Sequence, residues 1–101
     1  MIIYNITIKV EKQIADSWLQ WLLHEHIPAV MQTNCFVAYK VVRLLEVNDT
    51  DGPTYAVQYS ATSKADYNRY IEMYSSQMQK QSFDKWGEQF IAFRSVMEVV
   101  Q

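Results

Sequence analysis

The chain has 101 residues, half of them hydrophobic and 20% charged, and this composition excludes a disordered or fibrous protein. Its formal net charge of −2, without any cluster of Lys or Arg, excludes strong electrostatic attraction to nucleic acid or to anionic membranes. No stretch has the length of a membrane span or the pattern of a secretory signal, so we expect a cytoplasmic protein with no membrane partner.

The first two elements are distinguished by their hydrophobic period. Residues 2–10 alternate with a period of two, which predicts a strand with Tyr4, Ile6, Ile8 and Val10 on one face. Residues 13–32 change to three- and four-residue spacing, which predicts an amphipathic helix. Its apolar face comprises Ile14, Trp18, Trp21, Leu22, His26, Ala29 and Val30. Asn34, just past this helix, is suited to a left-handed cap.

The second half of the chain repeats strand and helix patterns. Residues 36–47 and 54–61 are rich in β-branched and aromatic types, and the turn residues 48–53 between them predict a hairpin. The run Thr62–Asp66 has a capping hydroxyl three residues before a carboxylate, which predicts a helix start. We expect this helix to break near Gln81–Ser82 and to stop at Gly87, and residues 89–100 to form a last strand.

The resulting order is βαββαβ. It predicts an α+β protein of one domain, residues 1–101, with a ferredoxin-like, four-stranded antiparallel sheet and two helices on one face. The other face of the sheet then lacks a cover from this chain. Because the second and fourth strands carry apolar residues at positions of both parities, we expect a homodimer in which a second copy covers that face.

Four segments, Met1–Asn5, His26–Pro28, Thr54–Tyr59 and Ala92–Arg94, resemble domain of unknown function family 4286, a bacterial family. The resemblance spans nearly the whole chain. The resemblance also matches Arg43 to an Arg on the second strand of that family. The family looks like a branch of the dimeric α/β-barrel group, which includes cofactor-free monooxygenases, ligand-sensing modules and isomerases. The resemblance therefore implies two sheets that meet face to face, and it leaves the chemistry open.

The chain offers no metal or cofactor motif. His24 and His26 are two residues apart on the predicted helix, so they point about 200° away from each other and do not bind one ion. Cys35 is alone, and the two glycines, Gly52 and Gly87, form no phosphate-binding loop. We expect no metal and no cofactor. His26, on the apolar face, is the candidate catalytic base or ligand contact; the alternative is a hydrogen-bonded residue at the edge of the core.

Polar and aromatic residues supply the other candidates. Asn5, Thr7, Gln58 and Ser60 lie on the polar parity of two central strands, and with Arg94 they are expected to form a polar floor. An inward Arg43 or Arg94 requires an anion, from an acidic ligand or from an internal salt bridge. The aromatic residues, which include Tyr55, recur at regular spacing. This spacing is compatible either with the lining of a ligand pocket or with a place in the core. The candidate ligand-binding residues are thus Asn5, His26, Arg43, Tyr55, Gln58 and Arg94.

Three functions are compatible with these features. The first is binding of a small, partly apolar molecule, acidic or aromatic, in a pocket of the homodimer; whether turnover follows is left open. The second is a non-catalytic regulatory or assembly module that acts through the dimer interface. The third is RNA-recognition-like binding, because Thr54–Tyr59 is similar to a third-strand RNA-binding motif, but the segment lacks the leading basic residue and Gly of that motif.

Overall fold

The computed structural model describes all residues from Met1 to Gln101. The first half contains β1 (Ile2–Val10), the helical segments η1 (Lys12–Ile14), α1 (Ala15–Trp21), η2 (Leu22–His26) and α2 (Ile27–Met31), and then β2 (Ala38–Arg43). The second half contains β3 (Thr54–Ala61), α3 (Lys64–Met73), α4 (Ser75–Trp86) and β4 (Phe90–Glu98). The βαββαβ order is therefore confirmed.

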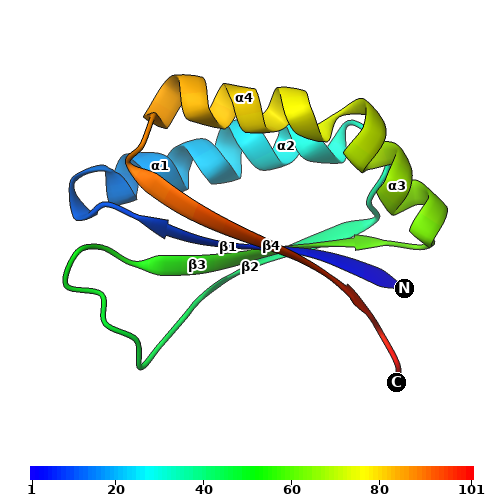
Figure 1. Ribbon diagram of the computed structural model, residues 1–101, viewed down its shortest axis with the longest axis horizontal. Coiled ribbons are helices and arrows are strands. Elements are labelled where there is room, and N and C mark those ends of the chain that lie inside the picture. Colours follow the sequence, from blue (N-terminus) through cyan, green and yellow to red (C-terminus); the bar gives the residue numbers. More distant parts are fainter.

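The four strands form one antiparallel sheet in the order β2–β3–β1–β4. All helices lie on the same side of this sheet (Figure 1). This is the predicted ferredoxin-like arrangement, in which β1 and β3 are central and β2 and β4 are the edges. None of the helices combines the length and the apolar character that crossing a bilayer requires.

The core lies between the helices and one face of the sheet. The predicted alternation of β1 is confirmed, because Tyr4, Ile6, Ile8 and Val10 are each at most 9% exposed. The first helical region contributes the buried Trp18, Leu22, Ile27 and Val30. The residues of β1 that alternate with the buried set face the uncovered side, where no other element of the chain lies over them (Figure 1).

The first helical region runs from Lys12 to Met31, within one residue of the predicted 13–32 at each end, but it contains a π-helical turn at Leu22–His26. This turn ends two residues before Pro28. In a regular α-helix the Pro28 ring would clash with the carbonyl group of His24, and Pro28 has no N–H to donate to it. A widened turn at this position relieves the clash. Asn34 follows the helix with φ 61°, which confirms the predicted left-handed conformation.

Two predicted boundaries are wrong. The second helix breaks at Tyr74, where φ is −129°, and α4 continues through Gln81 and Ser82 without interruption. Ser82 is accommodated because its hydroxyl group donates to the carbonyl oxygen of Met78, one turn earlier. The second strand covers only residues 38–43 of the predicted 36–47, because residues 44–53 form a long connection to β3. Gly87 ends α4 with φ 60°, as expected.

Candidate functional site

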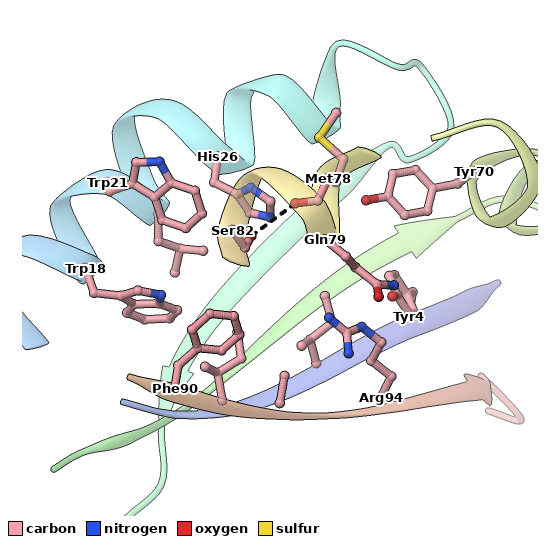
Figure 2. A pocket seen from close by; sticks show the side chains of 14 residues that line it. Tyr4, Trp18, Trp21, His26, Tyr70, Met78, Gln79, Ser82, Phe90 and Arg94 are labelled. Carbon is pink, nitrogen blue, oxygen red and sulfur yellow. Dashed lines mark hydrogen bonds between the residues drawn. The ribbon is translucent and has the colours of Figure 1, made fainter. Parts of the chain in front are cut away.

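A small cavity lies between the β1–β4 half of the sheet and the helices, with a volume of about 40 Å³. Its apolar wall combines aliphatic side chains with the aromatic rings of Trp18, Trp21 and Phe90 (Figure 2). Its polar groups come from five different elements and are His26, Tyr4, Tyr70, Gln79, Ser82 and Arg94. The cavity therefore combines an apolar body with a few convergent polar groups, which is the usual composition of a small-molecule site.

His26 ends the π-helical turn and lines the cavity. Its imidazole stacks on the indole ring of Trp21 and makes no hydrogen bond with another group of the chain. Burial, with a further contribution from the positive charge of Arg94, lowers the pKa of His26 from 6.5 to about 4. The ring is consequently neutral at pH 7, with one nitrogen that donates a hydrogen bond and one that accepts.

Arg94 reaches the same cavity from the edge strand β4. It is paired in register with Ile6, which places it on the helix-covered face, and its guanidinium points into the space below His26 and Gln79 (Figure 2). The three salt bridges of the chain all involve other residues, so no carboxylate neutralises Arg94. The side of the cavity toward β4 is open enough that Arg94 remains exposed.

Two phenol groups complete the polar side of the cavity. Burial raises the pKa of Tyr4, although the nearby charge of Arg94 partly opposes this effect, and burial likewise raises the pKa of Tyr70. Both side chains therefore keep their protons at neutral pH and can donate hydrogen bonds. No Asp or Glu is among the residues that line the cavity. The site is rich in donors and has no anionic acceptor.

The structure brings together only two of the predicted site residues, His26 and Arg94. Asn5 and Gln58 are paired with each other on the uncovered face of the sheet. There the amide of Asn5 donates to the hydroxyl groups of Thr7 and Ser95, at 3.1 and 3.4 Å. The expected polar floor is wrong in one respect, because Arg94 faces the opposite side of the sheet from Asn5.

The remaining two candidates lie outside the cavity. Arg43, on the other edge strand, pairs with Asp49 of the hairpin connection at 3.1 Å, and both side chains are at least half exposed. Tyr55 stacks on Trp18 with ring centroids 5.6 Å apart, as part of the core. His24, which was not a candidate, is exposed, and no group of three His, Cys, Asp or Glu side chains is close enough to hold a metal ion.

Sequence reasoning missed the contribution of α4, from which Met78, Gln79 and Ser82 line the cavity. Met78 and Ser82 are one turn apart on the inner side of this helix. That spacing was a usable signal, but the predicted break near Ser82 divided the face to which they belong. Phe90 was also missed, because residues 89–100 are apolar at both parities and the sequence does not indicate which side faces the helices.

Comparisons with known proteins support the fold and the family. The model of one family, described as Domain of unknown function (DUF4286), matches residues 1–100. No functionally curated protein matches the chain in sequence.

Solved structures that resemble the chain do so at low identity. A dimeric ferredoxin-like protein from an uncultured marine organism is 12% identical, with 100% of this chain and 96% of that chain covered and a TM-score of 0.71. An antibiotic biosynthesis monooxygenase is 13% identical, with both chains covered completely and a TM-score of 0.69. SnoaB, a cofactor-independent oxygenase from Streptomyces nogalater, is 10% identical, with 99% and 94% covered and a TM-score of 0.66.

Proposed function

The chain belongs to the DUF4286 family, and we propose that it is a cytoplasmic homodimer that binds a small, partly apolar molecule in the cavity between its sheet and its helices. One observation carries this proposal. A neutral imidazole without a hydrogen-bond partner and a guanidinium without a carboxylate, those of His26 and Arg94, converge on one aromatic-lined cavity.

A purely structural role explains this arrangement poorly. Polar groups in partly dehydrated positions lower stability unless they are paired, and the other arginines in the chain have partners. Arg43 has Asp49, and Arg69 donates to the backbone carbonyl oxygens of Thr33 and Asn34. At the cavity, neither the imidazole of His26 nor the guanidinium of Arg94 has such a partner, as expected where a ligand supplies it. Two buried groups away from the cavity, the hydroxyl group of Tyr59 and the indole N–H of Trp86, also lack a partner.

The size of the cavity limits what enters without rearrangement. A volume of about 40 Å³ holds about three water molecules, whereas pockets for drug-sized ligands are roughly ten times larger. The aromatic wall is fixed in the core, but Met78, Gln79 and Arg94 are long, unbranched side chains on the open side toward β4. Rotation of these side chains would enlarge the cavity for a larger ligand.

The homodimer is supported by the uncovered face of the sheet and by the relatives described as dimeric. Large apolar side chains on this face are exposed, above all Ile91 and Phe93 at 60% and 70%. Exposed side chains of this size on a sheet face, beside the polar Asn5 and Gln58, are typical of an interaction surface. A second copy of the chain would bury these side chains and leave the ligand cavity, on the other face, accessible.

Turnover of the ligand is a further part of the proposal. Two of the structural neighbours are described as oxygenases, one of them as cofactor-independent. In this chain, neutral His26 is placed to accept a proton and Arg94 to stabilise a developing negative charge. The competing function, an assembly module without a ligand, is favoured by the small volume of the cavity.

A thermal-shift screen distinguishes these functions. The wild-type protein is screened with small carboxylic acids, quinones and polyphenols, and hits are repeated with His26→Ala and Arg94→Ala, with Arg43→Ala as the control on the opposite sheet edge. We expect at least one class to raise the melting temperature of the wild type and of Arg43→Ala but not of the two cavity variants. If no compound shifts the wild type, or if hits shift all variants equally, ligand binding in this cavity is wrong and the assembly module is preferred.

A further inference from the structure

The cavity has a positive charge and several hydrogen-bond donors but no negative charge. Arg94 is the only charged side chain among the lining residues, and it has no counterion within the chain. Tyr4, Tyr70 and Gln79 add further hydrogen-bond donors around it (Figure 2). The opposite wall consists of Trp18, Trp21 and other apolar side chains, which offer no polar acceptor.

We propose that the molecule bound here is an organic carboxylate whose anionic group lies against Arg94, and that its binding brings a proton from solvent to His26. This inference rests on the proposed function and adds to it the chemical class of the ligand and a protonation that accompanies binding. The proton leaves an O–H bond of the solvent and forms an N–H bond on the imidazole, and the bonds of the ligand itself are unchanged.

A carboxylate matches the polar side of the cavity. The planar guanidinium presents parallel N–H donors that fit the two oxygen atoms of a carboxylate, and such charge-assisted pairs are stronger than neutral hydrogen bonds. The aromatic wall then covers the apolar remainder of the ligand. A carboxylate with few carbon atoms fits the present volume, and a larger one needs rotation of Met78 and Gln79.

The coupled proton follows from the groups that face His26. Among the elements packed around the cavity, β4 contributes the cation of Arg94, β1 and α3 contribute the phenols of Tyr4 and Tyr70, and α4 contributes no side chain that titrates. In the empty cavity, burial and Arg94 both disfavour an imidazolium. A carboxylate bound at Arg94 offsets that positive charge and adds a negative charge nearby, so it favours protonation of the accepting nitrogen of His26.

Matched acids and amides test the ligand class. Acetate, butyrate and benzoate are titrated into the ¹⁵N-labelled protein at pH 7, beside acetamide, butyramide and benzamide, and affinities are read from amide chemical shifts. We expect at least one carboxylate to bind at least tenfold more tightly than its amide. Arg94→Gln should remove this preference, and the fold should persist because Arg94 is exposed. Arg43→Gln, in which the altered residue does not line the cavity, should retain it.

The outcomes separate this inference from the proposed function. If amides bind in the cavity as tightly as acids, or more tightly, the anionic ligand class is wrong and small-molecule binding stands. If neither series perturbs the cavity residues and the thermal-shift screen is also negative, both are wrong.

Ring titration of the two histidines tests the proton. The pH titration of His26 is followed by NMR without ligand and with the tightest-binding carboxylate, and the exposed His24 serves as the internal control. We expect the midpoint of His26 to move upward by one pH unit or more and that of His24 to stay in place. An unchanged or lowered midpoint of His26 in the saturated complex would overturn the coupled protonation.

Discussion

The imidazole ring of His26 lies on the indole ring of Trp21, with ring centroids 4.7 Å apart and planes inclined by 24°. In a regular α-helix, two residues five positions apart point in directions that differ by about 140°. The π-helical turn Leu22–His26 brings the two rings to the same side of the helix. The stack, and with it the burial of the imidazole, therefore depends on this local departure from α-helical geometry.

Replacing Trp21 should change the titration of His26. Trp21→Leu removes the aromatic cover while it keeps an apolar side chain, so water gains access to the imidazole. We expect the pKa of His26 to rise from about 4 toward 6.5, as followed by NMR titration. Phe36→Leu, a core substitution away from the cavity, should lower stability without this shift. An unchanged His26 titration in Trp21→Leu would contradict the role of the stack.

Stability should fall at acidic pH because of His26. Its pKa is lowered in the folded state, so the unfolded chain binds the proton more tightly. The contribution of His26 to the free energy of unfolding is therefore fully present above pH 6.5, and it is lost as the pH falls from 6.5 through about 4. Between pH 7 and pH 4 this loss amounts to about 3 kcal/mol. Urea unfolding at both pH values measures it, and His26→Gln should show a correspondingly smaller loss; equal losses in both proteins would refute this assignment.

The dimer should depend on the uncovered face of the sheet. Phe93→Glu places a charge on the β4 side of the proposed interface, where it would lose its hydration on association. We expect the wild type to have the mass of two chains in analytical ultracentrifugation at about 100 µM, and Phe93→Glu to have the mass of one. Leu45→Glu is the matched control, because Leu45 is 78% exposed but lies in the connection between β2 and β3. A monomeric wild type, or a dimeric Phe93→Glu, would disprove this interface.

Substitution by alanine should reduce the stability of the protein to different extents at its two glycines. Both have positive φ, 147° at Gly52 and 60° at Gly87. A Cβ atom at Gly52 would collide with the carbonyl oxygen of Val10, whereas the space around Gly87 is open. We expect Gly87→Ala to cost about 1 kcal/mol, through backbone strain alone, and Gly52→Ala to cost several times more in urea unfolding. A smaller effect at Gly52 than at Gly87 would contradict the close packing of the hairpin connection on β1.

The fold was largely predictable because its elements have clear periodicity. The alternation from Ile2 to Val10 defined the central strand, and the capping run before Asp66 marked the start of α3: the Ser63 hydroxyl accepts from the Asp66 N–H. The break at Tyr74 was not predictable in this way. It is a local change of φ in a segment whose polar residues suit a helix on both sides, and nothing in the composition of Gln81–Ser82 distinguishes a break from a continuous helix.

The site was predictable only in part. His26 and Arg94 were identified separately, His26 from its helical face and Arg94 from the cost of an inward charge. Their meeting was not predicted, because the side of the sheet to which Arg94 points depends on the register of β4 against β1. In β4, Phe90 and Ala92 have one parity and Ile91 and Phe93 the other, so apolar character alone assigns neither to the helix-covered face.

The widened turn before Pro28 also has an evolutionary consequence. Deletion of a single codon between Trp21 and His26 would leave four steps of a regular α-helix in place of five steps through the widened turn, so the two side chains would still point within about 40° of each other. The sheet and its uncovered face would be unaffected by that change. A homologue without this one residue would thus retain the same architecture and the stacked pair of rings, with a helix that is one residue shorter.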